Sequence, residues 1–131
     1  MYAMTVELDL PIEPAIEKLK EALTAEKMGL VSEVNVQAIM KAKLDHDMPP
    51  YRMLGICGAG YAKRVLDADA DMGAMLPCSC AAYEIASGKT RIAIQDPEVV
   101  AGVTDQAAIK TAMSEARVAL GRVVATLGHK G

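Results

Sequence analysis

The chain has 131 residues, a net charge of −3 that is dispersed along it, and an apolar content of 52%. Its length suits a single domain over residues 1–131, and its apolar content excludes a disordered chain. It has no basic run interleaved with aromatic residues, no apolar stretch of about 18 residues and no signal-peptide pattern, which argues against nucleic-acid binding, membrane insertion and export. We therefore expect a cytoplasmic protein whose cysteines are reduced thiols.

The first part of the chain predicts strands and helices in alternation. Residues 4–9 alternate apolar and polar side chains, which is typical of a strand. A helix follows, with Gly29 as its expected C-cap and one apolar stripe formed by Ile12, Ile16, Leu19 and Leu23. Residues 30–36 predict a second strand, and residues 38–44 predict a short helix.

The rest of the chain predicts three strands and two more helices. A strand over 51–57 follows a proline-containing loop, and residues 61–66 have a helical pattern. Residues 78–86 and 89–95 predict a β-hairpin, because Ser-Gly between them suits a tight turn. The last helix, over 106–127, carries a narrow apolar seam that we expect to pack on the domain's own sheet, with a dimer contact as the alternative.

Together these elements predict a single α+β domain. The expected order is β-α-β-α-β-α-β-β-α, with Asp96-Pro97-Glu98 starting a further helical turn. One sheet, mixed or antiparallel and covered by helices, is the natural arrangement for this order. The pattern does not specify the order of the strands.

Two motifs give the sequence a family resemblance. The segment Met48–Cys57 resembles a signature of the domain-of-unknown-function 302 family, and so does Leu76-Pro77-Cys78, which leads into a strand with Tyr83-Glu84. The resemblance covers nearly the whole chain and implies a compact α+β fold, a homodimer and no established activity. The chain departs from the family pattern after Cys57, where it has Gly-Ala-Gly, and after Cys78, where it has Ser-Cys.

The cysteines are the strongest chemical signal in the sequence. Cys78 and Cys80 are two residues apart on a predicted strand, so both side chains are expected on one face of the sheet. Cys57 ends another strand just before a glycine-rich helix start, where the helix N-terminus favours a thiolate. If the two strands are neighbours, the three thiols converge.

Three chemistries fit such a cluster. A soft metal such as copper or zinc prefers thiolate ligands, with Cys57, Cys78 and Cys80 as the candidate metal set. Cys57 and Cys78 can form a redox pair if their Cα atoms lie within about 7 Å. Cys57 can also carry sulfur or another group covalently. The alternative is that all three are inert core residues, because cysteine is often buried as a small apolar side chain.

Other polar candidates lie around the first cysteine. Glycines at 55, 58 and 60 either cradle an anion with backbone N–H groups or allow close packing of strand and helix. Tyr51 is expected to anchor the edge of the core, and Arg52 either holds a carboxylate or phosphate or pairs across the strand with Glu84. His46 is a general-base or metal-ligand candidate in a loop, with a surface role as the alternative.

Two functional hypotheses follow. The first is a thiol-lined site formed by Cys57, Cys78 and Cys80, with Tyr51, Arg52 and Gly58 beside it, that binds a soft metal or handles a thiol or sulfur group. The second is a non-enzymatic homodimeric module that binds a small ligand or a protein through the Met48–Met53 segment. A hydrolase or transferase built on Arg52 and His46 is a third possibility, although no catalytic spacing supports it.

Overall fold

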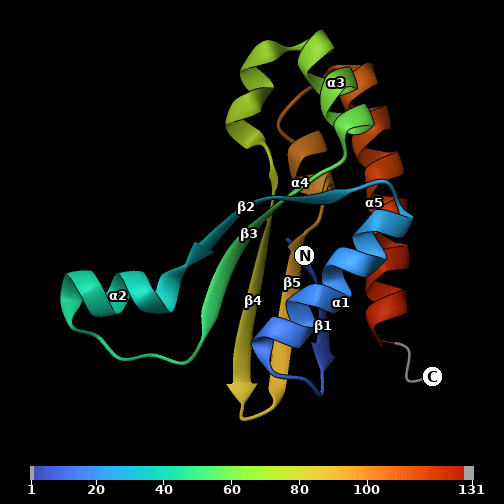
Figure 1. The fold of residues 1–131 in the computed structure, drawn as a ribbon. Coiled ribbons are helices and arrows are strands. Elements are labelled where there is room, and N and C mark those ends of the chain that lie inside the picture. The colour runs from blue at the N-terminus through green and yellow to red at the C-terminus, as the bar shows by residue number, and fades with distance from the viewer. Residues whose placement is uncertain (1, 129–131) are drawn as a thin grey trace.

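The computed structural model describes residues 2–128 of the chain (Figure 1). Its elements are β1 (Ala3–Leu8), α1 (Ile12–Ala25), β2 (Gly29–Asn35), α2 (Val36–Leu44), β3 (Tyr51–Cys57), α3 (Ala59–Ala68), the 3-10 helix η1 (Ala70–Met75), β4 (Cys78–Ala86), β5 (Lys89–Gln95), α4 (Glu98–Ala101) and α5 (Ala107–Gly128). The predicted order is confirmed, with most boundaries within about two residues. Among these helices, none is both long and apolar enough to cross a membrane.

The five strands form one antiparallel sheet in the order β1-β5-β4-β3-β2. The α+β class with a helix-covered sheet is therefore confirmed. The middle of the sheet is a meander of β3, β4 and β5, in which Ile56 is the register partner of Cys78. The two strands that come first in the chain lie at opposite edges, so α1 crosses from one edge to the other.

Helices cover only one face of the sheet. α1 and α5 lie side by side on it, and the core between them and the sheet contains the predicted seam of α5 (Figure 1). Neighbouring residues of β3 point to opposite faces of the sheet. Leu54, on the covered face, is 3% exposed, whereas Met53, on the open face, is 51% exposed. A second apolar cluster around Val65, Val100 and Ile109 joins α3, α4 and α5 beyond the end of the sheet.

The end of α1 differs from the sequence prediction. Lys27, not Gly29, adopts the left-handed conformation, with φ of 60°. The N–H groups of Met28 and Lys27 donate to the carbonyl oxygens of Leu23 and Thr24, which is the pattern of a Schellman motif. Gly29 instead begins β2. The Gly29 cap prediction is wrong because a lysine takes the position that glycine usually fills.

Residues 36–50 form an arm that projects from the body of the molecule (Figure 1). The arm consists of α2 and the loop that returns to β3. Val36 is the only buried residue of α2, and Gln37 donates a hydrogen bond to the carbonyl oxygen of Met48. Ile39 and Leu44 are 39% and 70% exposed, so the apolar side chains of α2 are largely uncovered.

Candidate functional site

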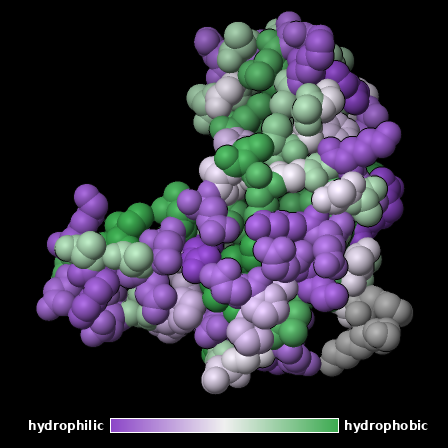
Figure 2. Space-filling view, viewed as in Figure 1, coloured by the Kyte–Doolittle hydropathy of each residue, from purple (hydrophilic) through white to green (hydrophobic). Residues whose placement is uncertain are grey.

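A cavity of about 280 Å³ lies where the upper end of the sheet meets α3, η1 and α5. We call it the cysteine cavity. Figure 2 shows hydrophobic side chains reaching the surface below α3, around its position. Its lining residues are almost all apolar: Met28, Val31, Ile56, Cys57, Gly58, Tyr61, Ala62, Leu66, Gly73, Leu76, Pro77, Cys78, Met113, Ala116 and Leu120.

Three local irregularities shape the wall of this cavity. The Schellman motif at the end of α1 turns the chain so that Met28 lies at the cavity. In β2 the register shifts between Leu30 and Ser32, which leaves Val31 as an extra, bulged residue at the rim. Such bulges bend an edge strand and redirect a side chain. The Schellman motif and the bulge both depart from the regular spacing of apolar residues from which the helices and strands were predicted.

Gly58 is the third irregularity, and it allows close packing. A Cβ atom built on Gly58 would lie 2.8 Å from Cδ2 of Tyr61 and 3.0 Å from Cγ of Met28. A larger residue would therefore displace two side chains of the wall. This supports the packing interpretation at Gly58, whereas no atom lies within 4 Å of a Cβ built on Gly60. The anion interpretation has no support, because the space beside Gly58 is lined by apolar residues.

Cys57 and Cys78 lie on the wall of the same cavity, as one sequence hypothesis required. Ile56 faces Cys78 in the sheet, so Cys57 is its diagonal neighbour, and the Cys57 side chain leaves the strand on the opposite face from that of Cys78. Strands about 4.8 Å apart with a rise of about 3.3 Å per residue place the two Cα atoms roughly 6 Å apart. Cys57 is half-buried and Cys78 is 9% exposed. Burial, followed by the nearby charge of Cys57, raises the pKa of the Cys78 thiol.

Cys80 does not join them. It shares a face with Cys78, as predicted, but it lies farther along β4 in the main core and does not line the cysteine cavity. Burial raises the pKa of its thiol to about 12. Within residues 2–128, no group of three histidine, cysteine, aspartate or glutamate side chains is placed to hold a metal ion. The predicted three-cysteine metal set is therefore not assembled.

Tyr51 and Arg52 lie at the opposite end of β3 from Cys57. Six residues of strand separate Tyr51 from Cys57, which is about 20 Å. Tyr51 stacks on Tyr83 with ring centroids 5.2 Å apart. Arg52 forms ion pairs with Glu13 at 2.7 Å and Glu33 at 3.3 Å. Its charge is thus balanced within the fold.

Three further polar predictions have a structural outcome. The expected partner of Arg52, Glu84, instead accepts a hydrogen bond from the backbone N–H of Ile12 at the start of α1. His46 lies in the exposed loop of the arm, away from the cysteine cavity. Asp96 behaves as predicted, because its side chain accepts from the N–H of Glu98 and caps α4. The single N–H at Nε of Arg117 is shared between the two carboxylate oxygens of Asp96, at 3.0 and 3.1 Å.

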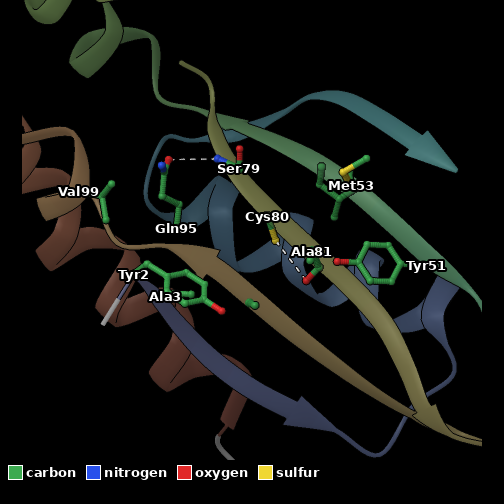
Figure 3. A pocket seen from close by; sticks show the side chains of 11 residues that line it. Tyr2, Ala3, Tyr51, Met53, Ser79, Cys80, Ala81, Gln95 and Val99 are labelled. Atoms are coloured by element: carbon green, nitrogen blue, oxygen red, sulfur yellow. Dashed lines mark hydrogen bonds between the residues drawn. The ribbon is translucent and has the colours of Figure 1, made fainter. Parts of the chain in front are cut away.

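A second hollow, of about 310 Å³, lies on the open face of the sheet. We call it the open-face groove. Figure 3 shows Tyr2, Gln95 and Val99 along one side and Tyr51 and Met53 on the other. The small side chains of Ala3, Ala81 and Ala93 make a shallow floor between them. Sequence reasoning missed this groove, because strand order decides which small residues lie together.

Comparison with known proteins supports the fold and the resemblance. A crystal structure of an uncharacterised conserved protein DUF302 from Bacillus stearothermophilus is similar, with a TM-score of 0.86 and 25% sequence identity. The alignment covers 97% of this chain and 98% of that one. Among curated proteins, none matched. The model of the family described as domain of unknown function DUF302 matches residues 4–127. The chain therefore belongs to the DUF302 family.

Proposed function

We propose that this protein binds a small apolar molecule in the cysteine cavity. The observation that carries the proposal is the almost entirely apolar wall of this partly open cavity, with the sulfur atoms of Cys57 and Cys78 and the ring of Tyr61 as its polarisable and polar groups. Ligand sites are typically concave and mainly apolar, with few polar groups that orient the ligand. The thiols come from the first sequence hypothesis, whereas the binding of a small ligand comes from the second, which had placed it at the Met48–Met53 segment.

The size of the cavity favours an organic ligand over a bare ion. A volume of about 280 Å³ compares with about 30 Å³ for one water in the liquid. A metal ion needs ligands that converge on one point, whereas this wall spreads over six elements of the fold. An apolar wall also disfavours a charged ligand, because no fixed charge lines the cavity to replace its water.

Fluorescence titration with N-phenyl-1-naphthylamine tests the proposal. This uncharged probe becomes brighter when it leaves water, and we expect saturable binding to the folded chain. Ala62→Leu places a larger side chain on the cavity wall and should weaken binding about tenfold or more. Ala59→Leu is the matched control, because Ala59 is exposed on the same helix and does not line the cavity.

Two results of this titration would contradict the proposal. Equal affinity in Ala62→Leu and Ala59→Leu would place the probe elsewhere on the protein and contradict the proposal. Absence of saturable binding to the unsubstituted chain would contradict it as well. Circular dichroism of each variant separates a filled cavity from an unfolded chain.

A second candidate function, assembly of two copies, is supported by the open face of the sheet. This face has a groove lined by alanine, tyrosine and methionine, and Met53 beside it is 51% exposed. The arm adds the exposed side chains of Ile39 and Leu44. Exposed apolar patches mark interaction sites more often than inert surface. We propose that a second copy of the chain covers the open face.

Light scattering over a range of protein concentrations tests this assembly. We expect the unsubstituted chain to behave as a dimer and Met53→Asp to shift it to a monomer, because burial of an unpaired carboxylate is costly. Val118→Asp is the control, since Val118 is also exposed, at 58%, but lies on α5. A monomer at every concentration, or equal loss in both variants, would contradict the proposal.

A further inference from the structure

The arm of residues 36–50 has a defined shape, but its own chain leaves it largely uncovered. At the start of α2 the Asn35 side chain accepts a hydrogen bond from the N–H of Ala38, and at its end Asp45 adopts a φ of 51°. Val36 is the only buried residue of this helix. A free helix of nine residues is marginally stable in water, so we expect another surface to cover it.

We infer that the arm of each copy lies in the open-face groove of a second copy, so that two chains exchange arms. This inference rests on the proposed assembly through the open face, and it names the segment that fills the groove. Four features of the structure support it: the placement of exposed apolar side chains, the area of the face, the charges on both surfaces, and the state of the sheet edge next to the arm.

Exposed apolar side chains gather on the arm and on the open face. Ile39 and Leu44 are exposed on the arm, and Figure 2 shows hydrophobic side chains along its upper side. Tyr2 and Met53 are exposed at the groove. Val34 is the register partner of Met53 on the neighbouring strand and is exposed as well. Contact between the two sets removes both from water, which is favourable.

The open face alone is small for a stable interface. Five strands about 4.8 Å apart, with a rise of about 3.3 Å per residue over some seven residues, give a face of roughly 500 Å². Two such faces bury about 1,000 Å², whereas specific interfaces usually bury about 1,200–2,000 Å². A nine-residue helix is about 14 Å long and 10 Å wide, so two arms bring the total to about 1,300 Å². The arms therefore supply the area that the faces lack.

The groove suits an apolar helix because no charged side chain lines it. Tyr2 forms one wall, and Tyr51, stacked on Tyr83, forms the other. Gln95, at the end of β5, already accepts a hydrogen bond from the N–H of Ser79 at 3.4 Å. A charged segment would lose its water here without gaining an ion pair, whereas the apolar side chains of the arm lose nothing of this kind.

The main charges of the arm are balanced within the arm itself. Nζ of Lys41 lies 2.9 Å from a carboxylate oxygen of Asp45 and 3.1 Å from one of Asp47. Lys41 is two residues after Ile39 and therefore lies on nearly the opposite side of the helix. The arm can thus place Ile39 in the groove while this group of ion pairs stays in water.

Exchange of arms also gives a closed pair. Each copy supplies one arm and one groove, so a two-fold arrangement uses both and leaves neither for a third copy. Association through the free edge of β2 is disfavoured, because the register shift between Leu30 and Ser32 interrupts the ladder that another strand would have to extend. The faces and the arms therefore offer a better interface than this edge.

Sedimentation equilibrium of arm variants gives the first test. Leu44 is 70% exposed, so Leu44→Asp removes little packing within its own chain. It places a carboxylate in the interface, and we expect the dissociation constant of the dimer to rise about tenfold or more. Val103→Asp is the control, because Val103 is also exposed but lies between α4 and α5. Equal dissociation constants for Leu44→Asp and the unsubstituted chain would overturn the inference.

Paramagnetic relaxation in a mixed dimer locates the arm directly. One chain carries Cys57→Ser and Ala42→Cys, with a nitroxide on the sulfur introduced at exposed position 42 of α2. The other chain carries Cys57→Ser alone and is labelled with nitrogen-15. Because the nitroxide and the observed nuclei are in different chains, only contact between copies broadens the signals.

We expect the strongest broadening at the amides of Ala81 and Ala93, on the floor of the groove. Strongest broadening at the edge of β2 would indicate pairing of edge strands. Strongest broadening in α1 and α5 would place the arm on the covered face. Either of these two patterns would overturn the inference.

Failure of this inference is distinguishable from failure of the proposed assembly. If Met53→Asp dissociates the dimer and Leu44→Asp does not, the open faces meet without the arms, so the assembly stands and the exchange of arms is wrong. If the unsubstituted chain is a monomer at every concentration, both proposals are wrong. Binding in the cysteine cavity is tested separately, because Leu44 does not line that cavity.

Discussion

The two faces of the sheet carry similar apolar side chains but differ in what covers them. On the covered face, α1 and α5 close over the strands, and the cysteine cavity remains at one end as a partly open space of about 280 Å³. On the open face, the same strands present alanine, methionine and tyrosine to the exterior around a groove of about 310 Å³. The two spaces are similar in size, so the difference between the faces lies in the helices that cover one of them.

The largest expected difference concerns two adjacent residues of β3. Leu54 is buried beneath the helices and Met53 lies on the open face. Leu54→Ala should lower the free energy of unfolding by about 2–5 kcal/mol, because it leaves a hole in a packed core. Met53→Ala should cost less than about 0.5 kcal/mol at protein concentrations where the chain is monomeric. Urea denaturation measures both, and equal losses would show that a bound surface buries Met53.

The second largest expected effect is a loss of stability when Gly58, at the cysteine cavity, is replaced. Gly58→Ala adds a Cβ atom against Tyr61 and Met28, and we expect a loss of about 1–3 kcal/mol together with weaker binding of N-phenyl-1-naphthylamine. Gly60→Ala is the matched control on the same helix. No atom lies within 4 Å of a Cβ built there, so it should be neutral or gain up to about 1 kcal/mol. Similar losses in both variants would remove the steric explanation.

Alkaline stability tests the covered face in another way. The folded state raises the pKa of Cys80 from 9.0 to about 12. The unfolded chain therefore ionises this thiol first, so its contribution is complete below pH 9 and is lost as the pH rises towards 12. We expect the free energy of unfolding to fall less steeply in Cys80→Ala, by about 1.4 kcal/mol per pH unit within that window. Identical slopes, measured by urea denaturation at several pH values, would refute an ionisable, desolvated Cys80.

The smallest effect concerns the open face. Tyr51 and Tyr83 are register partners whose rings stack at an angle of 14°. A double-mutant cycle with Tyr51→Leu and Tyr83→Leu should give a coupling energy of about 0.5–1.5 kcal/mol. Additive single effects would mean that the stack contributes no stability, and a larger value that depends on protein concentration would implicate the tyrosines in assembly.

The sequence predicted the elements well because chemical signals mark their ends. The hairpin of β4 and β5 has the expected boundaries, and Gly88 in its turn adopts a φ of 74°. The seam of α5 was also predicted, along with its packing on the domain's own sheet. These features depend on local spacing. The order of the strands did not follow, because it depends on pairings such as Ala3 with Gln95 that no local pattern encodes.

The candidate site was predicted only in part. Sequence spacing brought out Cys57 and Cys78, and the antiparallel pairing of β3 and β4 places them together. Tyr51 and Arg52 were grouped with them because they are near in sequence, but an extended strand carries them to its far end. Met28 and Val31 were missed, since a left-handed lysine and a strand bulge have no clear sequence signal here.

The position of β1 has a consequence for how the protein is made. Its only partner in the sheet is β5, and Ala3 faces Gln95 across that pair. On the ribosome, the first strand to emerge must wait until some ninety residues later before it finds its neighbour. The strands β2, β3 and β4 can pair in the meantime. The β1 edge of the sheet is therefore completed only after the pairing of β2, β3 and β4 has become possible.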